Sequence, residues 1–341
     1  MPPRVYRGKS AYEWHPKGGG AVRLCPLDAA RESVWEAYRH AKLEREKSTT
    51  VTVGTLLDNF MTSDRFRELA SNTQKDYRQC EKKLQAVFGA AAPEVVTAPI
   101  VRQFMDRRGQ TSKTRANREK ALLSSAWSWN YERGITAMPN PCEKVKPFKE
   151  AARDRYVTDE EYEAVFNLAP LHIQIAMEIA YLCAARQGDV LDLRRGRKDQ
   201  TQPEPGQTAV ILKQGIYIRQ GKTGVRQIKL WTPRLLAAVK AADQISSTIS
   251  SMYLIHNRQG QRYTPSGFRT AWHRTLKAWL GQDATSAHPG WYTYHDLKAK
   301  GISDYEQGDK QEFSGHLTRA QMERYNRRIS EVNALDPEHR K

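Results

Sequence analysis

The carboxyl-terminal part of the sequence contains a tyrosine, two histidines and a lysine whose types and order could support chemistry. His295 and Lys298 stand one helical turn apart, and Tyr325 follows His316 by nine positions. A tyrosine hydroxyl can serve as a nucleophile that forms a covalent intermediate, and histidine can accept or donate the proton. Cations can hold the charge that develops on phosphoryl oxygens. These residue types therefore suit cleavage of a phosphodiester in which the protein itself is the nucleophile.

Two further cationic positions precede this group. Arg186 follows an apolar stretch and stands three positions before Asp189, while Lys222 lies in a turn beside Gly221. A guanidinium can donate two hydrogen bonds to one phosphate, and a carboxylate one helical turn later can orient it. Taken singly, these residues are ordinary: an exposed Arg–Asp pair, a solvated turn lysine, a capping or partly buried histidine, a packed tyrosine. Their order along the chain is what favours a site.

In order and spacing, these residues resemble the active-site boxes of the tyrosine recombinases, the phage-integrase family. That family has an arginine box, a lysine in a β-hairpin, His-x-x-Arg, Leu-Gly-His and a nucleophilic tyrosine. The matching positions in this chain are Arg186, Lys222, His295, Lys298, His316 and Tyr325. Asp189 matches the acidic position of the arginine box. At the level of domains, the resemblance extends over the whole chain.

The resemblance implies a role for each matching residue. Tyr325 would attack phosphorus and leave a 3′-phosphotyrosyl link, which conserves the bond energy, so that strands are rejoined without ATP, a metal ion or another cofactor. Lys222 would be the general acid for the leaving 5′-oxygen, and His295 the base or proton shuttle beside the tyrosine hydroxyl. The non-bridging oxygens would be held by Arg186, Lys298 and His316.

Two positions depart from the family pattern. Lys298 stands where the family has arginine, so the charge is kept but the planar fork that can bind two phosphate oxygens is lost. Ser314 stands where the family has leucine. The interval between Lys298 and His316 is also shorter than in the family and passes through Gly301 and Gly308. This interval predicts a trimmed helix.

The composition favours a polyanionic partner. The chain has 55 lysines and arginines against 38 acidic residues, a net charge of +17 and a pI near 9.7. We find no apolar run of about 18 residues that could span a bilayer and no signal-peptide pattern. We therefore expect a DNA-associated protein in the cytoplasm, and the resemblance implies a bacterial host cell. Four scattered cysteines lack the spacing of a zinc site or a disulfide scaffold, so free thiols and no metal are expected.

Residues 1–48 predict a small domain with a β-sheet and one helix. Basic and aromatic residues alternate before a glycine-rich turn at residues 17–20, and the simplest interpretation is two strands joined by that turn. Asp28 can cap the helix that follows. The resemblance implies an arm-type DNA-binding domain, whereas composition alone allows a lid with a solvated charged face. The candidate DNA-binding residues here are Arg4, Arg7 and Lys9.

Residues 50–148 show helical periodicity and predict a bundle of four helices. Gly89 ends the second helix, Thr97 can cap the third, and Gly134 ends the fourth. The resemblance implies a core-binding domain that grips DNA. Basic residues at the start of the fourth helix could lie along phosphates, or could be solvated charges over a packed apolar stripe. These residues are Lys113, Arg115, Arg118 and Lys120.

A linker and a catalytic domain follow. Proline and charged residues are frequent up to residue 155, so residues 149–156 are expected to form a linker. Thr158 and Glu161 form a capping-box pattern that opens the domain expected at residues 157–341. Alternating apolar residues at 209–230 predict a three-stranded β-meander. The predicted fold class is mainly α with small β elements (α+β): an N-terminal β-sheet and helix domain, a helical core-binding bundle, and a catalytic domain with a meander.

The resemblance implies site-specific recombination. An integrase of a phage, prophage or other mobile element would cut and rejoin double-stranded DNA at attachment sites as a homotetramer, with accessory DNA-bending proteins as partners. Two alternatives stay open: a homologue inactivated or weakened at Lys298 that only binds DNA, and a type IB topoisomerase-like enzyme that acts on one duplex. Retention of Tyr325 argues against the first, and the two basic domains ahead of the catalytic one argue against the second. The polar tail from Ile329 to Lys341 is a candidate contact with a neighbouring protomer.

Overall fold

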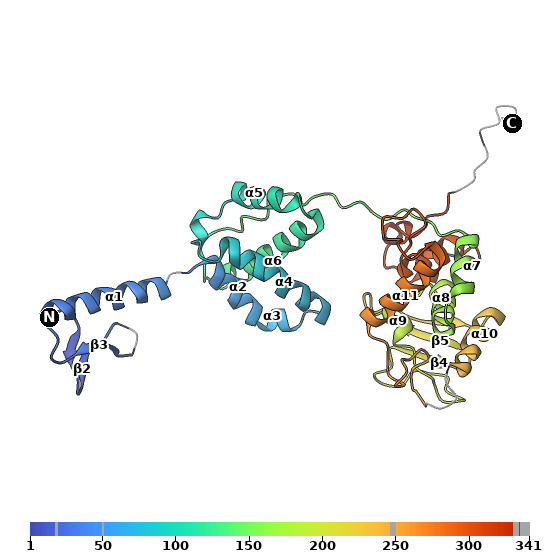
Figure 1. Cartoon of the computed structure of the whole chain (residues 1–341), viewed down its shortest axis with the longest axis horizontal. Helices are drawn as coiled ribbons and strands as arrows, with labels where there is room; N and C mark the ends of the chain where they lie inside the picture. The colour runs from blue at the N-terminus through green and yellow to red at the C-terminus, as the bar shows by residue number, and fades with distance from the viewer. Residues whose placement is uncertain (18–19, 50, 246–249, 330–333, 335–341) are drawn as a thin grey trace. The chain divides into compact units, whose positions relative to one another are not determined.

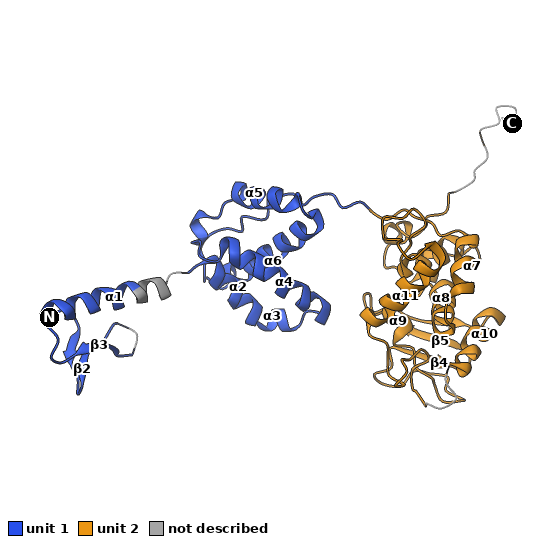
Figure 2. Ribbon diagram, in the orientation of Figure 1, with its two compact units in different colours: residues 1–151 blue, residues 152–341 orange. Residues whose placement is uncertain are grey.

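The computed structural model of the chain describes all residues except 18–19, 50, 246–249, 330–333 and 335–341. Most of the tail expected to contact a neighbouring protomer therefore lies outside the described residues. The chain divides into two compact units, Met1–Ala151 and Ala152–Lys341 (Figure 2). This division falls within residues 149–156, where the sequence predicts a linker.

A small antiparallel sheet and one long helix form the beginning of the first unit (Figure 1). Their bounds are Val5–Arg7 for β1, Ala11–Trp14 for β2, Val22–Pro26 for β3 and Arg31–Thr49 for α1. The sheet has three strands where two were predicted, because a tight turn at Gly8 folds β1 back onto β2, with Gly8 N donating to Ala11 O at 2.9 Å. The prediction that Asp28 caps the helix is wrong, since Asp28 lies in a turn that ends before α1 begins.

A helical bundle follows in the same unit. The bounds are Val53–Thr62 for α2, Asp64–Arg67 for α3, Ser71–Phe88 for α4, Ala98–Gly109 for α5 and Lys113–Tyr131 for α6. The four predicted helices correspond to α2, α4, α5 and α6, and the short α3 was missed. Ser112 caps α6 through its side chain, whereas Thr97 precedes α5 without a side-chain cap. Helix α6 contacts α2, α4 and α5, and buries Leu122, Leu123 and Trp127 among them.

The second unit packs helices around a second antiparallel sheet, whose strand order is β4-β5-β6. The strands are Ala209–Leu212 (β4), Gly215–Arg219 (β5) and Arg226–Leu230 (β6), so the predicted meander is confirmed. The helices are Asp159–Leu168 (α7), Leu171–Leu182 (α8), Gln187–Leu191 (α9), Pro233–Ala241 (α10), Pro265–Leu280 (α11), Tyr294–Asp304 (α12), Lys310–Ser314 (α13) and Arg319–Glu323 (α14). Thr158 and Glu161 form the predicted capping box at the start of α7.

Two buried helices organise this unit. Helix α8 is apolar around most of its circumference and contacts α7, α10 and α12. Helix α12 is buried continuously from Asp296 to Ser303. It can lie close to α8 because Gly301 faces the carbonyl of Tyr181, where a Cβ would collide with that oxygen. The fold is thus mainly helical with two small three-stranded sheets, which confirms the predicted fold class.

Within the described residues, no helix is long and apolar enough to cross a bilayer.

Candidate active site

The six residues predicted for catalysis all lie in the second unit, distributed over several elements. Arg186 is the N-cap residue of α9, and Lys222 is exposed in the turn between β5 and β6. His295 and Lys298 lie on α12, His316 follows α13 and Tyr325 follows α14. Because α12 contacts both α8 and α13, and α13 contacts α14, these elements bring the separate boxes of the sequence together.

Tyr325 lies between the two histidines. Its Oη is 3.1 Å from His295 Nε2, and its ring centroid is 4.6 Å from that of His316. The tyrosine ring also packs against a small apolar cluster that includes Ala184, two residues before Arg186, and Ile302 of α12. The turn that precedes Arg186 (the arginine turn), α12 and the segment around Tyr325 (the tyrosine segment) therefore pack against one another in a single apolar cluster.

Both histidines have pKa values below their ordinary range. Desolvation by the surrounding protein and the positive charge of Lys298 lower the pKa of His295 to about 4, although the residue is open to solvent on one side and Asp296 opposes the shift. Burial, Lys298 and Arg186 lower the pKa of His316 to about 4, with a further contribution from Lys222. At neutral pH a neutral His295 can accept the proton of the Tyr325 hydroxyl. The influence of Lys222 on His316 also brings the exposed hairpin lysine within electrostatic range of the site.

Ser314 constrains the protons of His316. Its Oγ lies 2.7 Å from His316 Nδ1 and 3.1 Å from the carbonyl oxygen of Gln311. The hydroxyl has one proton, so it either donates to Gln311 O and accepts from an Nδ1–H, or donates to Nδ1; in the second arrangement the neutral histidine carries its own proton on Nε2, which is buried and has no protein partner. In that tautomer Nε2 is available to donate to a phosphate oxygen. The serine that departs from the family pattern thus contacts a proposed phosphate donor.

Lys298 is fully buried beneath these groups. Its Nζ donates to the carbonyl oxygen of Ala184 at 2.6 Å and to that of Ser314 at 3.3 Å. Burial and the charge of Arg186 lower its pKa to about 7. The lysine therefore joins the turn before Arg186 to the turn before His316. The backbone of Ala184 has a positive φ of 48°, a conformation that L-residues adopt at some cost.

Gln220 connects three of the boxes and was not identified from the sequence. Its Oε1 accepts hydrogen bonds from Arg186 and from Thr223 of the hairpin turn, while its Nε2 donates to Ser314 O at 2.8 Å. Gly315 has a φ of 64°, and a Cβ at that position would collide with the Gln220 amide. A single glutamine has no spacing pattern, so only the folded chain reveals this role.

Asp189 links the arginine helix to the lysine hairpin. Its Oδ1 accepts from Gly221 N at 3.3 Å. Burial raises the pKa of this carboxyl group, although the backbone N–H of Gly221 and the charge of Arg186 oppose that shift. The residue thus supports the turn that carries Lys222, in addition to the predicted influence on Arg186.

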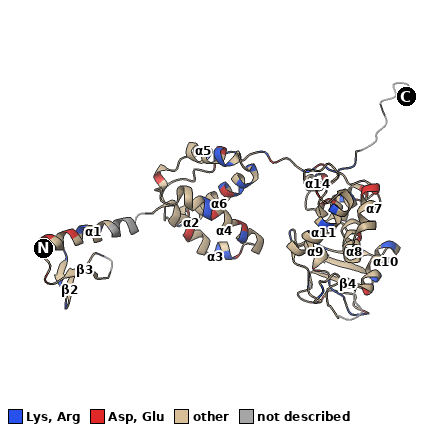
Figure 3. Cartoon of the chain, in the orientation of Figure 1, with Lys and Arg blue, Asp and Glu red and all other residues tan. Residues whose placement is uncertain are grey.

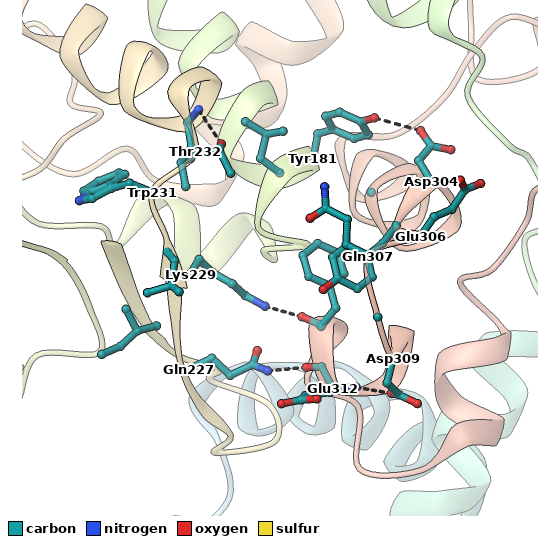
Figure 4. Close-up of a pocket in the computed structure, with 18 residues that line it drawn as sticks. Tyr181, Gln227, Lys229, Trp231, Thr232, Asp304, Glu306, Gln307, Asp309 and Glu312 are labelled. Carbon is teal, nitrogen blue, oxygen red and sulfur yellow. Dashed lines mark hydrogen bonds between the residues drawn. The ribbon is translucent and has the colours of Figure 1, made fainter. Parts of the chain in front are cut away.

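Strand β6 holds α13 in place from one side. Gln227 and Lys229 extend from β6 and donate to the carbonyl oxygens of Glu312 and Phe313 (Figure 4). A cavity of about 1000 Å³ adjoins these contacts, between β6 and the segment that joins α12 to α13. None of the described residues that line it belongs to the six catalytic candidates. Burial lowers the pKa of Lys229 to about 8.

The predicted DNA-binding residues of the first unit differ in exposure. Lys113 and Arg118 are exposed and Lys120 is half-buried, whereas Arg115 forms an ion pair with Asp76. Near the N-terminus, all three candidates are exposed: Arg4, Arg7 and Lys9. Figure 3 shows lysine and arginine interspersed with acidic residues along the helices of this unit. Of the four α6 candidates, Lys113 and Arg118 are therefore open to solvent, Lys120 is half-buried, and Arg115 has a structural contact.

Among the described residues, no group of three or more histidine, cysteine, aspartate or glutamate side chains is arranged to hold a metal ion.

Known proteins resemble this chain in structure and not in sequence. No protein-family model matches it, and no curated protein matches it. The lambda integrase dimer bound to a COC′ core site has a TM-score of 0.66 and 18% identity, over 99% of this chain and 98% of that one. The lambda integrase tetramer bound to a Holliday junction has a TM-score of 0.67 and 18% identity, over 98% of both chains.

A third structure extends the comparison to a transposon. The Tn1549 transposon integrase in complex with circular intermediate DNA has a TM-score of 0.62 and 14% identity, over 82% of this chain and 96% of that one. Likeness at such low identity concerns the fold. The chain therefore has the fold of the lambda and Tn1549 integrases, as its pattern of residues predicts.

Proposed function

We propose that this chain is a site-specific DNA recombinase, the integrase of a phage or other mobile element, which cuts and rejoins double-stranded DNA through Tyr325. The observation that carries the proposal is the 3.1 Å contact between Tyr325 Oη and His295 Nε2. Arg186 and His316 support it, because Gln220 and Ser314 connect both to the same site. The fold shared with integrases solved on DNA supports it further.

Cleavage exchanges one phosphodiester for another. Tyr325 Oη attacks phosphorus as His295 accepts the hydroxyl proton, and the bond between phosphorus and the 5′-oxygen breaks. The departing 5′-oxygen takes a proton from the Lys222 ammonium group. The products are a 3′-phosphotyrosyl link and a free 5′-hydroxyl. Attack by the 5′-hydroxyl of a second strand reverses these steps and releases the tyrosine, so no external energy source is needed.

The charge on the phosphate needs fixed donors. We assign the non-bridging oxygens to Arg186 and to His316 Nε2, and removal of one such donor typically lowers the rate roughly 10²–10³-fold. Lys298 contributes positive charge to the site from its buried position. To touch a phosphate oxygen directly, its Nζ would have to leave the carbonyl oxygens of Ala184 and Ser314.

We infer that double-stranded DNA at attachment sites is the substrate and that protomers assemble on it. Lambda integrase has been solved as a dimer on a core site and as a tetramer on a Holliday junction. A homotetramer on two duplexes is the corresponding assembly for this chain. The excess of 55 basic over 38 acidic residues is consistent with such a partner.

The test is a covalent protein–DNA adduct. The substrates are nicked duplexes tiled across the DNA that flanks the gene, so that a short oligonucleotide diffuses away after cleavage and rejoining fails. Wild type should give a protease-sensitive band, and Tyr325→Phe should bind the same DNA and give none. Tyr305→Phe, a tyrosine stacked on Phe313, is the matched control and should react normally.

Three outcomes would contradict the proposal. An adduct that persists in Tyr325→Phe would assign the nucleophile elsewhere. Tight, site-specific binding without an adduct in wild type would favour a DNA-binding protein. Relaxation of supercoiled DNA without exchange between duplexes would favour the topoisomerase-like alternative.

A further inference from the structure

The main chain on both sides of Tyr325 is fastened to α12. Ser303 Oγ donates to the carbonyl oxygen of Tyr325 at 3.1 Å and accepts from the N–H of Arg327 at 2.8 Å. Ser303 is buried, so water does not compete for these bonds. Lys310 adds a contact of 3.1 Å to the side chain of Asn326. The segment from Tyr325 to Arg327 therefore has a defined position on α12.

Arg327 extends this attachment to the start of α12. Its side chain is 7% exposed, and its Nη1 donates to Asp296 Oδ1 at 2.6 Å. Asp296 directly follows His295, which contacts the Tyr325 hydroxyl. One turn of α12 thus contacts the reactive hydroxyl through His295 and the Arg327 side chain through Asp296.

Asp296 is shared with the segment that enters this unit. Its Oδ2 accepts from Thr293 N at 2.7 Å and from Arg153 Nη1 at 3.0 Å. The carbonyl oxygen of Arg155 accepts from Arg327 Nη1 at 3.0 Å. Burial alone would raise the pKa of Asp296, but the hydrogen bonds from Arg327 and Thr293 lower it below its ordinary value. A charged Asp296 can therefore bind both guanidinium groups.

We propose that Asp296 and Arg327 are positioning residues that hold Tyr325 in place for attack, and that Arg153 couples them to the segment entering the unit. The inference rests on the proposed role of Tyr325 as nucleophile. Helix α14, which precedes Tyr325, has only five residues. Among the described residues after Tyr325, Arg327 forms a buried ion pair with α12, whereas the pair of Arg328 with Glu306 is exposed. A displacement of about 1 Å in such a group can cost roughly 10² in rate.

The first experiment compares two adjacent arginines. Arg327→Ala should lower the rate of adduct formation on the nicked duplex roughly 10²-fold while DNA affinity stays unchanged. Arg328→Ala removes the same charge one position later, from a side chain that is 56% exposed and pairs with Glu306, and should react normally. Arg327→Lys should recover part of the rate, because an ammonium group can still reach Asp296 with a single donor.

The second experiment separates positioning from proton transfer. A duplex with sulfur in place of the bridging 5′-oxygen has a leaving group that needs no proton. This substrate should restore cleavage by Lys222→Ala but not by Arg327→Ala. Normal cleavage by Arg327→Ala on either substrate, or its rescue by sulfur, would overturn the assignment. Absence of an adduct with wild type would instead refute the role of Tyr325 itself.

The third experiment addresses Arg153. Because its side chain is 60% exposed and Thr293 and Arg327 also bind Asp296, Arg153→Ala should have a smaller effect than Arg327→Ala. In an Arg327→Ala background the second substitution should add nothing further, since residues of one network are not additive. Additive effects of the two substitutions on the rate would show that Arg153 is not coupled to Asp296 and Arg327. If Arg327→Ala melts below the assay temperature, Arg327→Lys and Arg153→Ala provide the same comparison.

Discussion

Lys298 occupies the position where the resembled family has arginine, and the fold gives this lysine two structural partners. Its ammonium group bridges the carbonyl oxygens of Ala184 and Ser314 and is fully buried. An ammonium group is a compact charge with rotatable donors, which suits two carbonyl oxygens that belong to different turns. The substitution therefore preserves charge near the site while it ties the Arg186 and His316 turns together.

The burial of Lys298 predicts a pH-dependent contribution to stability. Its pKa is lowered to about 7, against about 10.4 in an unfolded chain. Between these values the unfolded state binds more protons, so the contribution to the free energy of unfolding rises with pH and is smallest below pH 7. Relative to Lys298→Met, the free energy of unfolding of wild type should rise by on the order of a few kcal/mol across this range.

Urea unfolding of both proteins at pH 7, 8 and 9 checks this expectation. Lys198→Met, on an exposed side chain, controls for the substitution itself. A difference between wild type and Lys298→Met that does not change with pH would show that the buried ammonium group keeps its charge in the folded protein.

The sequence identifies the site residues that belong to a motif, but not those whose role depends on contacts in the fold. His295, His316 and Tyr325 could be selected because their spacing carries a pattern, and the fold brings these three into contact. Gln220 and Arg327 could not, since a lone amide and one arginine among many have no spacing signature. Their partners lie far away in sequence, as in the bond between Gln220 and Ser314, so only the folded chain defines them.

At the scale of elements, α12 and the β5–β6 hairpin do most of the positioning. Helix α12 carries His295, Asp296, Lys298 and Ser303, which contact the tyrosine segment, the arginine turn or the histidine turn. The hairpin contributes Gln220 and, through β6, the contacts that hold α13. Both elements donate to the Ser314 carbonyl oxygen, α12 through Lys298 and the hairpin through Gln220.

The contacts of Gln220 in the hairpin predict that its substitution will slow adduct formation. Gln220→Ala removes the acceptor of Arg186 and the donor to Ser314, so both proposed phosphate donors lose a support. Adduct formation should slow on the order of 10- to 100-fold, and DNA affinity should stay unchanged. Gln214→Ala, in the turn between β4 and β5, is the matched control. Equal rates for the two variants would show that the Gln220 amide has no positioning role.

Apolar periodicity predicted the longer helices and the meander, whereas short elements and one helix cap were missed or misassigned. The four long helices of the bundle and the meander follow from apolar spacing that the core uses, as in Leu122, Leu123 and Trp127. Helix α3 escaped because four residues are too few to show a period. Strand β1 escaped because its pairing depends on a tight turn at Gly8. Asp28 was misassigned because aspartate is common both at the N-cap of helices and in turns.

At the scale of the whole molecule, net charge was readable from the sequence and its distribution was not. The net charge of +17 predicts a polyanionic partner. The fold then separates basic residues that are open to solvent from those with internal partners. Lys113 and Arg118 are exposed on α6, while Arg115 pairs with Asp76. Only the exposed residues are free to neutralise phosphates without breaking a contact in the fold.

This separation predicts how salt affects DNA binding. If roughly 6–10 phosphates are neutralised, affinity should fall about 10³–10⁵-fold between about 50 and 200 mM salt. Lys113→Ala combined with Arg118→Ala should reduce the slope of log affinity against log salt by about 2, because each lost phosphate contact removes about 0.9. Arg115→Ala should instead lower thermal stability and change the slope little, since it breaks the ion pair with Asp76. Fluorescence anisotropy across a salt series measures all three proteins, and a wild-type affinity that does not change with salt would contradict phosphate-dominated binding.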